Sequence, residues 1–148
     1  MISPPDHDFF MKKAISMAEL AYEQGEVPVG AVLVCNGKVI TKTYNQTELL
    51  HDATAHAEML AISAGCAYFN SKYLKDCVLY ISLEPCPMCA AALYWTQIKT
   101  IVWGANDEKR GCSLYSPSLL HPTTEVISGL FATESQRLLK QFFKEKRY

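Results

Sequence analysis

The chain has 148 residues, of which 49% are hydrophobic and 20% are charged, and its formal net charge is −1. This size and composition are typical of a soluble globular protein, and we expect a single domain spanning residues 1–148. The near-neutral charge excludes a polycation that binds nucleic acid by overall charge, so any such contact must come from a local patch.

Patterns of apolar, turn and capping residues predict alternating helices and strands along the chain. In chain order these are a helix over residues 9–24, strands over residues 29–35 and 38–44, a helix over residues 54–65, a strand over residues 77–83, a helix over residues 86–95, strands over residues 100–103 and 124–127, and a helix from residue 133. Asn36 and Gly37 join the first two strands as a hairpin turn. This order predicts an α/β fold, a three-layer α/β/α sandwich with a central mixed five-stranded sheet.

Several residues are predicted to begin or end these helices. Asp6 or Asp8 would cap the first helix and Gly25 would end it, Thr54 would cap the second, Pro85 would take the first position of the third, and Thr133 with Gln136 resembles a capping box before the last. We also expect the aromatic residues Tyr94, Trp95 and Phe143 to lie in the core.

The N-terminal residues contain no apolar run typical of a secretory signal, and no stretch approaches the roughly 20 apolar residues that cross a bilayer. We therefore expect a cytoplasmic protein with no membrane contact, in which thiols stay reduced. Four of the six cysteines are scattered and are interpreted as small core residues, namely Cys35, Cys66, Cys77 and Cys112.

Cys86 and Cys89 have a meaningful spacing. They lie at i and i+3 in the first turn of a predicted helix, so both sulfurs share a face, and the helix N-terminus lowers the pKa of a thiol there. Alone, the pair is compatible with a disulfide, a redox switch, a structural metal clip or a catalytic metal site. A redox pair usually follows a first strand, whereas this pair follows the third.

His56 provides a third candidate ligand, a nitrogen. Two sulfurs and one nitrogen suit zinc, and three protein ligands leave a fourth position for water, which is the layout of a catalytic zinc site. Glu58, two residues after His56, is placed to take a proton from that water. A closed structural site would need a fourth ligand, for which Cys66, Cys112, His51 and His121 offer no telling spacing. The joint pattern of His-x-Glu followed by Pro-Cys-x-x-Cys is a signature of zinc-dependent nucleobase deaminases.

Further stretches extend this likeness over nearly the whole chain. They are GEVPVGAVLV (Gly25–Val34), Asn45, HDATAHAEM (His51–Met59), LYISLEPCPMCAAAL (Leu79–Leu93) and WGANDEKRG (Trp103–Gly111). With these residues the chain resembles the cytidine deaminase superfamily and, within it, the bacterial tRNA-specific adenosine deaminases.

The resemblance implies one zinc ion per chain, held by His56, Cys86 and Cys89. Glu58 would carry a proton to the adenine N1 atom and then to the leaving ammonia, so that adenosine becomes inosine at the wobble position of a tRNA anticodon. Substrate contacts are implied for Asn45, for the backbone of Ala57 and Glu84, and for Asp107. A homodimer is also implied, with the tRNA anticodon stem-loop reaching residues of both subunits.

Alternatives remain for several of these residues. Asn45 would also suit the end of a strand, and Asp107 would also suit a loop cap. Cationic residues occur in one loop and on the last helix, where they predict a modest phosphate-binding surface or simply complement the helix dipole: Lys109, Arg110, Lys140, Lys144, Lys146 and Arg147. The segment between Gly111 and Gly129 departs from the family pattern, so the RNA contacts of residues 112–126 are not implied.

Two other functions compete with tRNA deamination. The zinc motifs are equally suited to a deaminase of a free base or nucleoside, such as guanine, cytosine or cytidine. A zinc-stabilised binding module without activity is the third hypothesis, and Glu58 argues against it because a structural site has no use for a carboxylate beside the metal.

Overall fold

The computed structural model describes residues 6–146. Its elements are, in chain order, α1 (His7–Glu23), β1 (Gly30–Cys35), β2 (Lys38–Tyr44), α2 (Ala57–Phe69), β3 (Cys77–Leu83), α3 (Pro87–Thr96), β4 (Thr100–Ala105), the 3-10 turn η1 (Cys112–Leu114), β5 (Glu125–Ile127) and α4 (Ala132–Lys146). The predicted order of helices and strands is confirmed.

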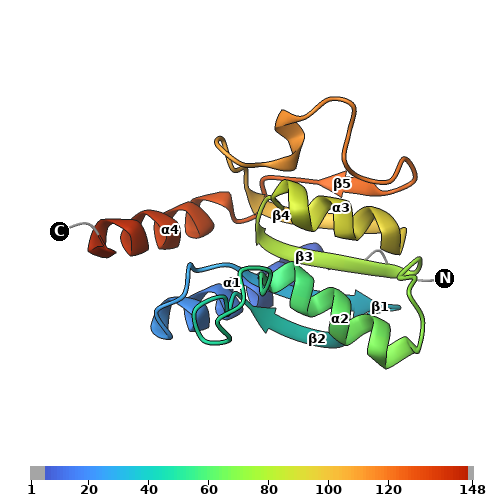
Figure 1. The fold of residues 1–148 in the computed structure, drawn as a ribbon, viewed down its shortest axis with the longest axis horizontal. Helices are drawn as coiled ribbons and strands as arrows, with labels where there is room; N and C mark the ends of the chain where they lie inside the picture. The colour runs from blue at the N-terminus through green and yellow to red at the C-terminus, as the bar shows by residue number, and fades with distance from the viewer. Residues whose placement is uncertain (1–5, 147–148) are drawn as a thin grey trace.

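The five strands form one mixed sheet in the order β2-β1-β3-β4-β5 (Figure 1). β1 runs antiparallel to both β2 and β3, whereas β3, β4 and β5 are parallel. The antiparallel pairing of β1 with β2 follows from the hairpin turn, in which Asn36 and Gly37 both have positive φ, at 51° and 77°.

Helices cover both faces of the sheet, so the predicted three-layer α/β/α sandwich is confirmed (Figure 1). Because successive strand residues point to opposite faces, each strand contributes to two cores. Leu33, Leu79 and Ile101 face α2 and α3, whereas Val32 and Tyr80 face α1.

The close contact between α1 and the sheet depends on small residues. Asp6 caps α1, as predicted, by accepting a hydrogen bond from the Phe9 N–H at 3.0 Å. Ala14 and Ala18 are fully buried, and a Cβ atom at Gly30 would lie 2.2 Å from the Ala14 carbonyl oxygen. The helix therefore lies directly on β1 at a glycine.

Three predicted helix starts are wrong by a few residues. α2 begins at Ala57 with His56 as its N-cap, because Thr54 instead donates its N–H and hydroxyl to the Asp52 carboxylate at 2.8 and 2.7 Å. α3 begins at Pro87 with Cys86 as its N-cap, so Pro85 precedes the helix. α4 already includes Ala132, and the predicted capping box at Thr133 and Gln136 therefore lies inside it.

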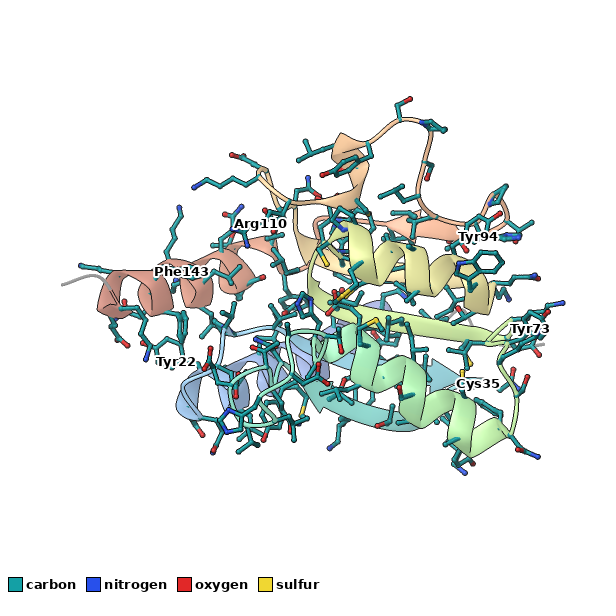
Figure 2. All side chains as sticks on the ribbon, viewed as in Figure 1. Tyr22, Cys35, Tyr73, Tyr94, Arg110 and Phe143 are labelled. Carbon is teal, nitrogen blue, oxygen red and sulfur yellow. The ribbon has the colours of Figure 1, made fainter. Side chains whose placement is uncertain are left out.

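The prediction that three aromatic residues lie in the core is also wrong. Trp95 is 74% exposed, Phe143 45% and Tyr94 37%. Trp95 lies on the side of α3 away from the buried Ala90 and Leu93, and Tyr94 lies at the edge of the buried face. Phe143 belongs to the part of α4 that projects from the body of the molecule (Figure 2).

The register of the sheet brings distant segments together at one end. Gly30 pairs with Tyr44 and Leu83 pairs with Ala105, so the residues that precede β1 and those that follow β2, β3 and β4 meet there. α2 and α3 both begin near this end (Figure 1). Among residues 6–146, no helix is long and apolar enough to cross a membrane.

Candidate metal centre

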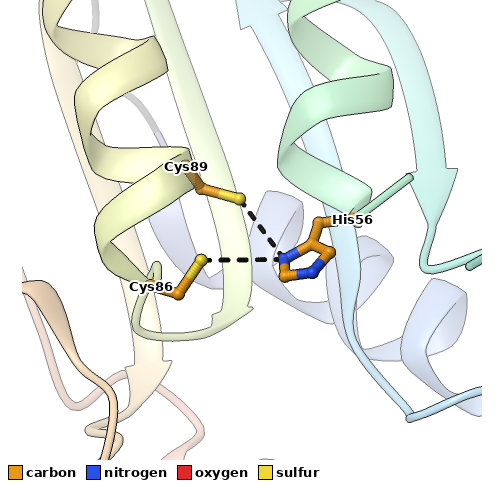
Figure 3. A group of neighbouring side chains, drawn as sticks. All are labelled: His56, Cys86 and Cys89. Carbon is orange, nitrogen blue, oxygen red and sulfur yellow. Dashed lines mark hydrogen bonds between the residues drawn. The ribbon is translucent and has the colours of Figure 1, made fainter. Parts of the chain in front are cut away.

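Three of the predicted site residues converge where α2 and α3 begin. His56 is the N-cap of α2, Cys86 is the N-cap of α3, and Cys89 is the third residue of α3. The His56 Nδ1 atom lies 3.7 Å from the Cys86 sulfur and 3.5 Å from the Cys89 sulfur (Figure 3). One ligand atom from each of the three residues lies within 4.8 Å of the others.

Local sequence explains how α3 presents its two sulfurs. Pro87 occupies the first helical position, where its missing N–H costs nothing, and this places Cys86 immediately before the helix. Cys89 then lies one turn further along, on the same face. The predicted shared face of the two cysteines is therefore present, with Cys86 as a cap residue.

The protonation of the two thiols is coupled. A hydrogen bond with the Cys89 thiol has the largest effect on Cys86 and lowers its pKa. A second hydrogen bond, with His56, lowers the pKa further. The contact between the two sulfurs, together with burial, raises the pKa of Cys89. Cys86 is thus the sulfur that loses its proton first, and a cation placed among the three ligand atoms would replace the remaining thiol proton of Cys89.

This donor set fits zinc. Zinc prefers thiolate sulfur and imidazole nitrogen, and here two sulfurs and one nitrogen face each other. Within residues 6–146, no fourth His, Cys, Asp or Glu joins the group, so three protein ligands leave a position for water, as in catalytic rather than structural sites.

Glu58 lies in the first turn of α2 and is only 4% exposed. Burial raises the pKa of its carboxyl to about 7, and a hydrogen bond with the Cys89 thiol is among the contacts that oppose this rise. The structure therefore places a buried carboxyl against one of the sulfur ligands, on the same helix end as His56.

Asn45 follows β2 and is 6% exposed. Its side-chain amide donates to the Val27 carbonyl at 3.2 Å, and its main-chain N–H donates to the Val29 carbonyl at 3.0 Å. Asn45 thus ties the end of β2 to the residues preceding β1. Ala57 is fully buried, and its carbonyl accepts the Thr43 hydroxyl at 2.7 Å.

Asp107 lies in the loop after β4. Its Oδ1 atom accepts the N–H groups of Lys109 and Arg110 at 3.1 and 3.0 Å, so the carboxylate does cap a turn. The two cationic residues of this loop are exposed.

Sequence reasoning assigned only the backbone of Glu84 to the site, but its side chain is also engaged. The Glu84 carboxylate is 2% exposed and accepts the N–H groups of Asp107 at 3.0 Å and Ser113 at 2.8 Å. Because these partners lie 23 and 29 residues further along the chain, no local spacing could have indicated them.

Glu26 has a similar role in a different loop and was not predicted. It is 1% exposed, and its carboxylate accepts the N–H groups of Glu48 at 3.0 Å and Leu49 at 2.7 Å. This contact holds the segment between Asn45 and His56. The sequence signal that could have indicated a buried role for Glu26 is its place as a glutamate inside an otherwise apolar stretch, GEVPVGAVLV.

The cationic residues of α4 lie on its exposed surface. Thr133, Gln136, Arg137, Lys140, Gln141 and Lys144 line a shallow hollow along the helix. The predicted phosphate-binding surface also included Arg147, which lies outside the described residues.

Comparison with known proteins agrees with this geometry. The family model described as the cytidine and deoxycytidylate deaminase zinc-binding region matches residues 4–105. The tRNA-specific adenosine deaminase of Aquifex aeolicus is 43% identical, with 95% of each chain covered.

Solved structures show the same fold. A structure from a study of A-to-I editing by tRNA:A34 deaminases at the wobble position of transfer RNA superposes with a TM-score of 0.83 at 40% identity, covering 88% of this chain and 99% of that one. A guanine deaminase from Bacillus subtilis superposes with a TM-score of 0.65 at 39% identity, covering 68% of this chain and 65% of that one.

Proposed function

Because the chain belongs to the cytidine and deoxycytidylate deaminase family and, within it, to the tRNA-specific adenosine deaminases, we propose that it converts adenosine to inosine at the wobble position of a tRNA anticodon and releases ammonia. The observation that carries the chemistry is the convergence of His56, Cys86 and Cys89 beside the buried Glu58. The similarity to tRNA-acting relatives, which extends over nearly the whole chain, supports tRNA as the substrate. Residues 1–148 would act as one zinc-dependent deaminase domain.

His56, Cys86 and Cys89 would hold one zinc ion per chain. When bound, zinc supplies a Lewis acid that lowers the pKa of water to about 7, which makes a nucleophile available at neutral pH. The ligands come from two helix N-termini, and the partial positive charge at the start of α3 favours the thiolate form of its N-cap residue Cys86.

Glu58 would move the protons. Its carboxylate would accept a proton from the attacking water and deliver it to the adenine N1 atom, while the oxygen adds to C6. The same carboxyl would then protonate the leaving ammonia. General acid–base catalysis by one positioned group typically contributes 10²–10⁴-fold.

Four residues would bind the base and its neighbours. Asn45 would hydrogen-bond the flipped base, the backbone of Ala57 and Glu84 would contact its reacting edge, and Asp107 would lie near the nucleotide. In support, the register of the sheet brings the segments that carry Asn45, Glu84 and Asp107 to one end of the fold, and Ala57 begins α2 there.

The tRNA anticodon stem-loop is the proposed macromolecular partner. Lys109 and Arg110 are exposed in the loop after β4, and Lys140 and Lys144 are exposed on α4. Such cations contribute non-specific affinity for phosphates, which falls as salt rises. The proposed location is the cytoplasm, where a tRNA substrate is available.

A homodimer is also proposed. α3, which carries both sulfur ligands, exposes Trp95 (74%) and Tyr94 (37%), and Leu114 and Tyr115 of the nearby loop are 56% and 50% exposed. A contiguous exposed apolar patch commonly marks a protein interface. We expect a second copy of this chain to cover them, with RNA reaching both subunits.

The test is to count zinc in the purified protein and to incubate it with an anticodon stem-loop that carries adenosine at the wobble position. One zinc per chain together with inosine in the RNA is the expected result. Guanine, cytosine, cytidine and adenosine are assayed in parallel, because zinc without inosine but with turnover of a free base or nucleoside would replace the tRNA function. The 43% identity to a tRNA-specific adenosine deaminase over 95% of each chain favours the tRNA outcome.

A further inference from the structure

The side chain of Glu84 has a role that the chemistry above does not use. It lies between β3 and α3, two residues before Cys86, and is buried. Its partners among the described residues are the N–H groups of Asp107 and Ser113 and the thiol of Cys112, whose sulfur lies 3.8 Å from the carboxylate. A buried carboxylate satisfied by main-chain N–H groups fixes the position of the backbone that donates to it.

The loop is folded closely around this carboxylate. A Cβ atom at Gly111 would lie 2.3 Å from the Glu84 Oε1 atom and 2.6 Å from the Asp107 carbonyl oxygen. Only a residue without a side chain leaves room for the carboxylate at this point. Gly111 itself donates its N–H to the Asp107 carbonyl at 2.9 Å.

Further hydrogen bonds join the same two segments. The Glu84 N–H donates to the Ala105 carbonyl at 2.9 Å, and the Cys112 N–H donates to the Pro85 carbonyl at 2.9 Å. The segment that leads into the metal ligand Cys86 and the loop of residues 106–113 therefore form one hydrogen-bonded unit. At the tip of that loop, Lys109 and Arg110 face solvent.

We infer that Glu84 is a positioning residue for RNA binding: its carboxylate holds the 106–113 loop so that Lys109 and Arg110 meet the phosphates of the RNA whose base enters the metal centre. This inference rests on the proposed function and deepens it. The carboxylate acts through the two cations and does not itself touch the substrate.

Glu84→Gln is the direct variant. It keeps the size of the side chain but turns an N–H₂ group towards one of the two main-chain N–H donors, so one hydrogen bond is lost and two donors face each other. Gly111→Ala is the second variant, which displaces the carboxylate sterically from the loop side. Both are compared with Glu26→Gln, a matched control that removes the same kind of contact from the segment holding Glu48 and Leu49.

The expected result is a split between binding and chemistry. For the anticodon stem-loop, KM rises by about tenfold, as expected for the loss of two phosphate contacts, and the fall in kcat is smaller. The slope of log affinity against log salt becomes less steep by roughly 1–2, since each phosphate contact contributes about 0.7–0.9. Glu26→Gln leaves this slope unchanged, because Glu26 holds no cation in place.

Two further measurements separate loop positioning from general loss of structure. Trypsin cleaves after Lys109 and Arg110 faster in Glu84→Gln than in the wild type, while zinc remains at one per chain. In a double-mutant cycle, Glu84→Gln adds little to a variant that already carries Lys109→Ala and Arg110→Ala, since the carboxylate acts through those residues.

Three outcomes would overturn the inference. The first is an unchanged KM and salt slope in Glu84→Gln, and the second is additive effects in the double-mutant cycle. The third is a loss of zinc or a fall in kcat at constant KM, which would mean that Glu84 supports only the metal ligands. A wild-type protein that neither binds nor deaminates the stem-loop would overturn the proposed function, and this inference with it. Normal wild-type turnover with a silent Glu84→Gln would overturn this inference alone.

Discussion

At the scale of single residues, substitution can distinguish the proton-transfer role of Glu58 from the metal-binding role of the three ligands. We predict that Glu58→Ala keeps the fold and the zinc but lowers turnover by at least about 10²–10⁴-fold, because one carboxyl carries out several proton transfers. Burying a carboxyl is itself costly, so its loss offsets part of the cost of the cavity that the alanine leaves, and the fold is kept. Zinc counting and single-turnover inosine formation check both halves of this prediction.

Ser63→Ala, on the exposed side of the same helix, is the control and should behave like the wild type. Wild-type turnover by Glu58→Ala would show that another group moves the protons. Loss of zinc from the variant would show instead that the carboxylate supports the metal site.

The thiols are predicted to differ sharply in reactivity once the metal is removed. Hydrogen bonding to Cys89 lowers the pKa of Cys86 to about 4, so Cys86 is a thiolate at pH 6 and should be alkylated by iodoacetamide after chelation. Burial raises the pKa of Cys77 and of Cys112 to about 12, so both stay protonated and unlabelled at pH 6 and at pH 8. Mass spectrometry of the labelled peptides gives the measurement.

The zinc-loaded protein is the control, because metal coordination occupies the Cys86 sulfur. Equal labelling of Cys86 with and without chelator would mean that this sulfur is not a ligand. Labelling of Cys77 before Cys86 would contradict the burial and hydrogen bonding on which the prediction depends.

At the scale of elements, the packing of α1 on β1 is predicted to be the least tolerant of an added methyl group. A Cβ atom at Gly30 would lie 2.2 Å from the Ala14 carbonyl oxygen and 2.4 Å from the Ala18 nitrogen, and backbone atoms of a helix cannot move aside. We expect Gly30→Ala to lower the free energy of unfolding by about 3 kcal/mol, at the upper end of overpacking effects. Chemical denaturation measures this value.

Gly37→Ala is the matched control. A Cβ atom there meets no other atom within 4 Å, but φ is +77°, so only backbone strain is introduced. This strain is expected to cost about 1–2 kcal/mol. If Gly30→Ala were no more destabilising than Gly37→Ala, α1 would not rest on the sheet as described.

The same scale shows what the sequence could and could not predict about the fold. β2 and β3 were predicted to the residue because the Asn36-Gly37 turn before β2 and the apolar run of β3 are local signals. The start of α2 was not, because Thr54 binds Asp52 and leaves His56 as the cap. α3 is apolar around most of its circumference, so its sequence did not reveal that Trp95 faces outward.

The candidate site divides in a similar way. The convergence of His56, Cys86 and Cys89 was predictable because each pair or motif has a characteristic short spacing, and the structure brings them together. The carboxylates of Glu26 and Glu84 were not predictable as loop anchors, because their donors lie 22–29 residues away in sequence. Only the fold brings such main-chain N–H groups to a side chain.

At the scale of the whole molecule, the outer surface of α3 is predicted to be a dimer interface. Trp95→Arg places a charge at the residue that is 74% exposed on this surface, and an unpaired charge in an interface core is strongly unfavourable. We expect the variant to sediment as a monomer, with lower activity on the anticodon stem-loop, where the wild type sediments as a dimer. Analytical ultracentrifugation over a range of concentrations tests this.

Phe9→Arg is the control, since Phe9 is 50% exposed on α1, across the sheet from α3. It should leave the dimer intact. A wild-type protein that is a monomer at all concentrations, or a Trp95→Arg variant that remains a dimer, would contradict the proposed interface.

The metal centre joins two parts of the chain that are 30 residues apart, since His56 begins α2 and Cys86 begins α3. Coordination would therefore act as a reversible cross-link that closes a loop containing all of α2 and β3. Closing a loop of this length removes about 3–4 kcal/mol of chain entropy from the unfolded state. The same three side chains that make the site reactive would thus also fasten α2 to α3 on one face of the sheet, so that metal supply sets the stability of the fold as well as its chemistry.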